Sequence, residues 1–242
     1  MSRYEFNKMK MNFNKIIECI RMKINDNREL RSNIYSLILY GSFIRGDFIK
    51  NVSDIDFFAV LFRESKNTIN KLRNILNYCC KDVEAIEIDL SWECLGNLDD
   101  PLNKGYPYKF LTIYQEDFLN NHVVIYGSSI KNLIPKYNWK ELVKWRVYRL
   151  LNYSNKWMNN AKMLHITAGE VIRLLALING AKTIKKNDIL KILRKIGDND
   201  ALKIFMAYLS GRRYIFDKDF LINFISSRIR EILKEASKYE YK

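Results

Sequence analysis

The stretch LILYGSFIRGDFIKNVSDIDFFAV, residues 37–60, places two carboxylates where a buried strand begins. One apolar run ends at Gly41-Ser42, and a second apolar run follows directly after Asp54 and Asp56. Both runs are short, rich in β-branched and aromatic residues, and bounded by turn residues, which predicts two buried strands. The two aspartates stand two positions apart, so in a strand their side chains project from the same face.

Two anions side by side next to a buried strand repel each other and lose hydration, and a divalent cation removes both problems. Mg²⁺ accepts one or two carboxylates together with substrate phosphates. Gly41 has no Cβ, so a phosphate can approach its backbone, and Ser42 offers an N–H and a hydroxyl donor. A short helix beginning near Phe43 would add its positive end. A phosphate cradle followed by metal-binding carboxylates predicts phosphoryl or nucleotidyl transfer.

A third carboxylate is expected from the neighbouring strand. Between Ile86 and Glu93 the sequence alternates between apolar and polar residues, which predicts a half-buried strand with an acidic face. That face offers Glu87 and Asp89. Either could complete a two-metal site and deprotonate the acceptor hydroxyl, and the sequence leaves both open.

The order of these parts resembles the nucleotidyltransferase superfamily that shares the DNA polymerase β palm: a strand, Gly-Ser, an eleven-residue connector and D-x-D. The resemblance implies Mg²⁺-dependent transfer of a nucleoside monophosphate from an NTP, with ATP as the expected donor. Gly41 and Ser42 would hold the triphosphate, and Asp54 and Asp56 the metals. The third acid of the family would fall on Glu87 or Asp89, which both match its pattern of an acid between apolar residues.

The chain reads as an α+β half, with a small mixed sheet backed by helices, followed by an all-helical half. We therefore predict a nucleotidyltransferase catalytic domain over residues 1–135 and a C-terminal helical domain over residues 136–242. This layout is similar to that of the aminoglycoside nucleotidyltransferases, which implies a small hydroxylated acceptor. The expected strands are 34–40, 55–62, 86–93 and 122–127. The expected helices are 4–30, 66–80, 140–164, 187–196 and 217–236, and a further helix is expected to begin with a capping box formed by Thr167 and Glu170.

The net charge of +14 is uneven, with +3 in residues 1–140 and +11 in residues 141–242. A basic half attracts phosphates, nucleic acid or an acidic partner. Two alternatives therefore stay open: transfer to an RNA end or a protein hydroxyl, and a non-catalytic nucleotide- or RNA-binding module.

The sequence also bears on where the chain works. No run of 18 or more apolar residues appears, so we expect no membrane span. The residues at the N-terminus do not resemble a secretory signal. Four cysteines without zinc-like spacing are expected to be free thiols in a reducing cytosol, so the expected location is cytoplasmic.

Overall fold

The computed structural model describes residues 3–100, 102, 108–152, 154–212 and 214–237. These residues divide into two compact units. The first holds the described residues up to 102 together with 118–135, and the second holds 108–117 and the residues from 136 onward. The division predicted at residue 135 keeps 108–117 with the sheet, whereas the structure packs this segment with the helices.

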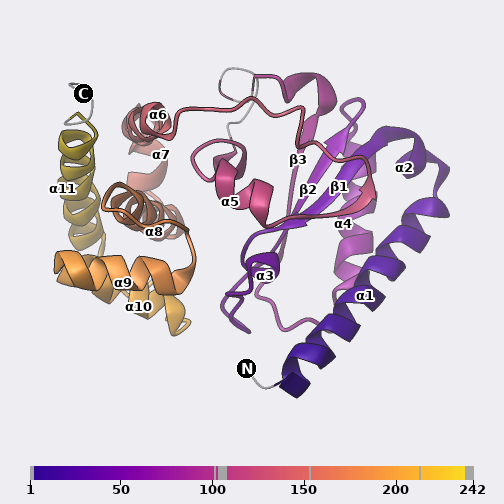
Figure 1. Cartoon of the computed structure of the whole chain (residues 1–242), viewed down its shortest axis with the longest axis horizontal. Helices are drawn as coiled ribbons and strands as arrows, with labels where there is room; N and C mark the ends of the chain where they lie inside the picture. The colour runs from indigo at the N-terminus through magenta and orange to yellow at the C-terminus, as the bar shows by residue number, and fades with distance from the viewer. Residues whose placement is uncertain (1–2, 101, 103–107, 153, 213, 238–242) are drawn as a thin grey trace. The chain divides into compact units, whose positions relative to one another are not determined.

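A four-stranded mixed sheet organises the first unit, in the order β3-β2-β1-β4 (Figure 1). β1 (Ile34–Tyr40) pairs antiparallel with both β2 (Ile55–Leu61) and β4 (Val123–Gly127), and β3 (Ile88–Cys94) runs parallel to β2. The sheet and its helices confirm the α+β class expected from the sequence. Shorter elements are α3 (Ser42–Arg45), α5 (Gln115–Asn120) and the 3₁₀ turns η1 (Leu95–Asn97) and η2 (Lys109–Leu111).

One face of the sheet is covered by α1 (Arg3–Asn25), α2 (Arg28–Asn33) and α4 (Lys66–Cys79), which form a shared apolar core with it. Phe57 and Ala59 of β2 lie in this core with the helical residues. Because side chains alternate along a strand, the even-numbered residues of β2 point to the opposite face. The helix expected over 4–30 is two helices, because the side chain of Asn27 accepts a hydrogen bond from Leu30 N and starts α2.

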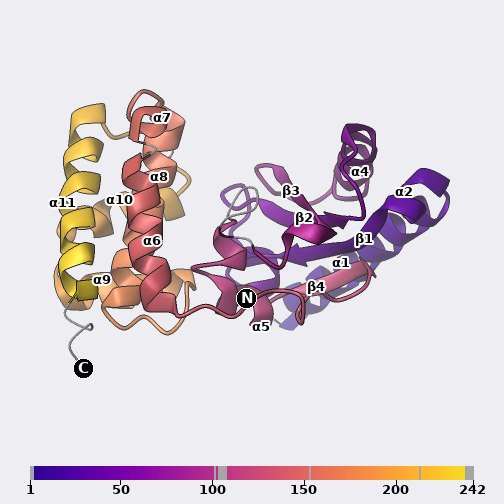
Figure 2. The same cartoon turned by 90° about the horizontal axis from the view of Figure 1, so that it is seen from above.

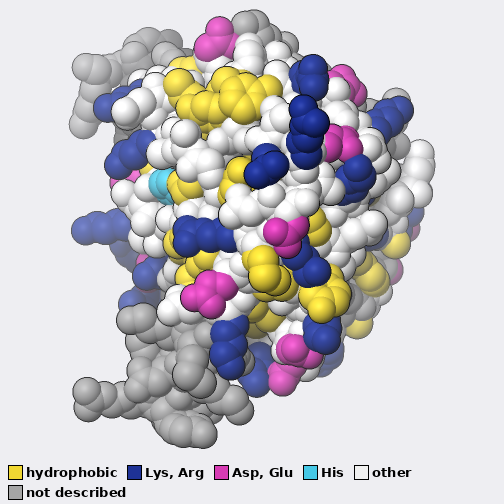
Figure 3. Space-filling model, turned by 90° about the vertical axis from the view of Figure 1, so that its right-hand side faces the viewer, with side chains coloured by type: hydrophobic (Ala, Val, Ile, Leu, Met, Phe, Trp, Pro, Cys, Tyr) yellow, Lys and Arg dark blue, Asp and Glu magenta, His cyan; other side chains and the backbone are white. Residues whose placement is uncertain are grey.

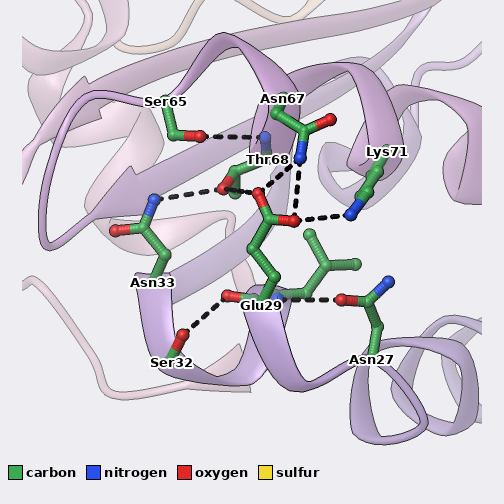
Figure 4. A network of polar contacts seen from close by, with 9 residues as sticks. Asn27, Glu29, Ser32, Asn33, Ser65, Asn67, Thr68 and Lys71 are labelled. Atoms are coloured by element: carbon green, nitrogen blue, oxygen red, sulfur yellow. Dashed lines mark hydrogen bonds and ion pairs between the residues drawn. The ribbon is translucent and has the colours of Figure 1, made fainter.

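A polar network fixes the end of the sheet where β1 begins and β2 ends (Figure 4). The Asn33 side chain donates to Thr68 Oγ1 at 3.1 Å and accepts from the backbone N–H of Arg63 at 3.1 Å. Glu29 accepts from Asn67 and Lys71, and the hydrogen bond from Lys71 is the main cause of the lowered pKa of this carboxylate. The network joins α2 to α4 at the end of the sheet remote from Gly41.

A disulfide links Cys19 of α1 to Cys79 at the end of α4, with 5.9 Å between their Cα atoms. The prediction of free thiols is therefore wrong for these two cysteines, and it is correct for Cys80 and Cys94. The helical pattern places each cysteine on its own helix, but it carries no signal that α1 and α4 pack side by side and bring the two sulfur atoms together.

Six helices, labelled in Figure 2, make up most of the described second unit. The most deeply buried of them is α8. Ten of its eighteen residues are buried, so it forms the centre around which the other helices pack. The six are α6 (Trp139–Asn152), α7 (Ser154–Met158), α8 (Ala161–Ile178), α9 (Lys186–Ile196), α10 (Asn199–Leu209) and α11 (Lys218–Ser237). α10 has no counterpart among the helices predicted from the sequence.

Two predictions for this unit are wrong. The helix expected over 140–164 is interrupted, because Asn160 caps the start of α8 by accepting a hydrogen bond from Met163 N at 3.0 Å. Thr167 and Glu170 therefore lie inside α8, and both are buried rather than forming a capping box. Sequence spacing alone does not distinguish a helix start from an interior turn that uses the same residues.

The face of the molecule that Figure 3 shows carries charged side chains of both signs. On the face shown in Figure 3, lysine and arginine side chains are spread among acidic and hydrophobic ones. None of the described helices is both long enough and apolar enough to cross a membrane.

Candidate active site

Three chain segments meet at one end of the first unit's sheet. β1 ends at Tyr40, which pairs with Asp56 near the start of β2. β3 runs parallel to β2, and its second residue, Asp89, pairs with Asp56 from the other side. The sheet thus brings the Gly41-Ser42 turn and the predicted acidic residues to the same end.

Gly41 is the residue whose identity the site most clearly requires. Its backbone has φ 77° and ψ −157°, a conformation that is essentially restricted to glycine. A Cβ at this position would lie 2.0 Å from Oδ2 of Asp56. The Asp56 carboxylate therefore lies directly against the backbone of the turn, in space that only a glycine leaves open.

Ser42 follows as the first residue of α3, and it is almost fully buried. Its carbonyl oxygen accepts hydrogen bonds from the backbone N–H groups of Gly46 and Asp47, both at 3.1 Å. These bonds fix the peptide that carries the serine, so the direction of its side chain is set by a closed turn rather than by a flexible loop.

The predicted carboxylates differ in how the structure places them. Asp54 and Asp56 are half-buried, and Asp89 is exposed. Paired residues on neighbouring strands lie about 4.8 Å apart and point to the same face, so Asp89 stands beside Asp56. Glu87 lies just before β3, with its side chain exposed and its carbonyl accepting from Ile55 N at 3.1 Å.

The donor set fits Mg²⁺, because carboxylate and hydroxyl oxygens are hard ligands. The described part of the chain has no group of three or more histidine, cysteine or acidic side chains arranged to hold a metal ion. Mg²⁺ is usually bound by one or two protein carboxylates together with substrate phosphates, and two carboxylates are what Asp54 and Asp56 offer.

The connector between Ser42 and Asp54 contains an ion pair that the sequence analysis did not assign to the site. Arg45 Nε lies 3.0 Å from Oδ1 of Asp47, and the side chains are only 9% and 15% exposed. The sequence signal is an arginine and an aspartate on either side of a glycine, separated from Gly-Ser by two residues.

A second polar cluster is buried in the helical unit around Glu170 of α8. Arg146 of α6 pairs with it through both of its fork nitrogens, and Lys109 Nζ lies 3.3 Å from Oε2. Burial alone would raise the pKa of Glu170, but Lys109 and Arg146 outweigh burial and lower the pKa to about 2. Tyr114 completes the cluster: burial and the charge of Glu170 raise its pKa, and no described group hydrogen-bonds its hydroxyl.

A curated protein and a solved structure illustrate what this chain is similar to. A phosphomannomutase from Mycoplasmoides pirum is 25% identical over 126 residues, which span 52% of this chain and 21% of that protein. The chain thus covers about a fifth of the length of this relative. In structure, the chain resembles the spectinomycin adenyltransferase of Enterococcus faecialis, solved with ATP and spectinomycin. The TM-score is 0.62 at 14% identity, and the match covers 91% of this chain and 99% of that one, so it shows a shared fold.

Residues 20–106 match the family model described as nucleotidyltransferase domain. This range contains the Gly-Ser turn, the connector and all four predicted carboxylates. A nucleotidyltransferase domain implies transferase activity. The Gly41 turn beside Asp56 and the strands β1, β2 and β3 lie within this range and agree with its match to the nucleotidyltransferase domain.

Proposed function

We propose that this protein is a Mg²⁺-dependent nucleotidyltransferase that moves a nucleoside monophosphate from ATP to a hydroxyl of a small molecule such as an aminoglycoside. The observation that carries the proposal is the contact between Asp56 and the backbone of Gly41, because it brings a carboxylate of the D-x-D motif directly against the Gly-Ser turn. The shared fold with an adenyltransferase solved with ATP and spectinomycin supports the donor and the class of acceptor.

In this proposal Asp54 and Asp56 hold Mg²⁺, which when bound neutralises phosphate charge and stabilises the leaving group. Ser42 donates hydrogen bonds to the triphosphate from its N–H and hydroxyl. The acceptor oxygen forms a new bond to the α-phosphorus, the bond from the α-phosphorus to the bridging oxygen breaks, and pyrophosphate leaves. The acceptor's proton passes to a carboxylate of the site.

The register of β2 and β3 supports Asp89 as that third carboxylate. Asp89 is paired with Asp56 and lies on the same face, whereas Glu87 precedes the strand. Residues two apart along a strand are separated by about 7 Å, so only one of the two acids can serve the same reacting centre.

The experiment is incubation of the purified chain with Mg²⁺ and each labelled NTP, beside a panel of spectinomycin, aminoglycosides, total RNA and cell protein. The control is Asp54→Asn, which keeps the size of the side chain and removes its charge. We expect ATP-derived label on a small molecule, and none with the control variant. Label on RNA or protein would instead establish the alternative acceptor class, for which the net charge of +11 over residues 141–242 gives a reason. No transfer to any of these would contradict the proposal.

A further inference from the structure

The connector between the donor-binding turn and the carboxylates is held by a buried ion pair. Arg45 contacts Asp47 through two nitrogens, Nε to Oδ1 at 3.0 Å and Nη2 to Oδ2 at 3.4 Å. Both side chains are largely shielded from water. This fork geometry is the one that an arginine forms with a carboxylate and that a lysine cannot reproduce.

The same aspartate also closes the backbone turn under Ser42. Asp47 N donates to Ser42 O, as does Gly46 N, and Gly46 adopts φ 84°, which lets the chain reverse direction there. Arg45 N in turn donates to Gly41 O at 3.0 Å. The side-chain pair and the backbone bonds therefore act within one seven-residue segment, which runs from Gly41 to Asp47.

A buried ion pair is weak evidence for stability, because removing two charges from water offsets most of their attraction. Its better-attested use is to specify one conformation among several. Here the conformation that it specifies is the turn that presents Ser42. A direct role of Arg45 in binding phosphate is less consistent with the structure, because the charge of its guanidinium is already compensated by Asp47.

We propose that Arg45 and Asp47 are positioning residues for nucleotide binding: as a pair they hold Ser42 in the geometry that binds the donor triphosphate, and Arg45 does not bind the phosphates itself. This inference rests on the proposed function. It adds two residues to the site whose effect passes through Ser42.

The test is the equilibrium affinity of the full chain for ATP in the presence of Mg²⁺, measured for Arg45→Lys, Asp47→Asn and the double variant. If the pair positions Ser42, each single change weakens binding about tenfold, and the double variant is no weaker than either single one, because the same interaction is lost each time. If Arg45 binds phosphate directly, Arg45→Lys retains the charge and has a small effect. Asp47→Asn then leaves the affinity unchanged or increases it.

A matched control is the pair formed by Arg228 of α11 with Asp198 before α10, at 2.5 and 2.9 Å. Arg228→Lys and Asp198→Asn break a pair of the same geometry in the other unit, and we expect the ATP affinity to stay within twofold of that of the wild type. Should Asp47→Asn fail to fold, Asp47→Glu keeps the carboxylate, and its affinity should then lie between wild type and Arg45→Lys.

The outcomes separate the two proposals. Wild-type affinity for ATP in both Arg45→Lys and Asp47→Asn would overturn the positioning role and leave the proposed function standing. A wild-type chain that binds no nucleotide in Mg²⁺ would overturn the proposed function, and the positioning role with it. Equal losses in the Arg228 and Asp198 variants would show that any damaged ion pair lowers affinity, which would also overturn the specific role.

Discussion

Replacing Gly41 by alanine tests the contact on which the candidate site depends. The added Cβ would lie 2.0 Å from Oδ2 of Asp56, whereas such contacts are essentially never shorter than 3.0 Å. The carboxylate must therefore move by about 1 Å or more, and a displacement of about 1 Å in a catalytic group can lower the rate about 100-fold. We expect kcat/KM for nucleotidyl transfer to fall by at least that factor.

The same substitution also strains the backbone, so the loss of activity has to be separated from a loss of stability. Alanine in the conformation of Gly41 costs about 1–3 kcal/mol. Gly197 offers a matched control, because its φ of 71° is similar but no atom lies within 4 Å of the position of its Cβ. Gly197→Ala should lower the melting temperature and leave transfer unchanged.

The assays are thermal unfolding and transfer of labelled nucleotide to whichever acceptor of the panel is modified, with the affinity for ATP in Mg²⁺ measured in parallel. A Gly41→Ala protein that is folded at the assay temperature and has kcat/KM within twofold of the wild type would refute the reasoning. It would mean that the carboxylate of Asp56 does not have to lie where the structure places it.

Three further predictions follow from named contacts. In a transfer assay, Asp89→Ala should be severe and Glu87→Ala mild, and the reverse order would identify Glu87 as the third acid. Chemical denaturation of Glu170→Gln should show a loss of about 3–5 kcal/mol, because the change leaves the buried cation of Arg146 without its carboxylate and also removes the partner of Lys109. Since the folded pKa of Glu170 is about 2 and its ordinary value is 4.5, its contribution is complete above pH 4.5 and should be lost as the pH falls toward 2. Cys79→Ser should lower the free energy of unfolding by about 2–4 kcal/mol, and dithiothreitol should cause the same loss in the wild type. If neither the substitution nor dithiothreitol lowers it, the disulfide does not form in solution.

Much of the sheet could be predicted from the sequence because local patterns decide it. β1 and β2 are short apolar runs bounded by Gly41 and Asp54, and the structure has them within a residue of the predicted ends. The resemblance to the nucleotidyltransferases could also be recognised from the sequence, because Gly-Ser and D-x-D are close together in the chain and their spacing is characteristic.

The features that the sequence did not predict all depend on which segments of the chain lie next to each other in the folded structure. The choice between Glu87 and Asp89 depends on the register of β3 against β2, which no local pattern contains. The disulfide requires that two helices pack side by side. The buried cluster around Glu170 combines η2, α6 and α8, so its glutamate looked like a capping residue when it was read with its neighbours alone.

The far end of the sheet contributes to the site although it holds none of its residues. Side chains alternate along β2, so a slip of one residue against β1 would exchange Asp56 with Phe57 and turn a carboxylate into the apolar core under α1 and α4. Asn33 opposes such a slip, because it precedes β1 and bonds to Arg63, just beyond β2, through its side-chain oxygen and its amide nitrogen. The turn at Gly41 has little freedom to correct a wrong register, since its backbone already lies against Asp56. The bonds between Asn33 and Arg63 therefore hold the pairing of Tyr40 with Asp56 from the opposite end of the two strands, and the position of the carboxylate depends on contacts at both ends. Asn33 is also part of the polar network of Figure 4, which joins it to α4.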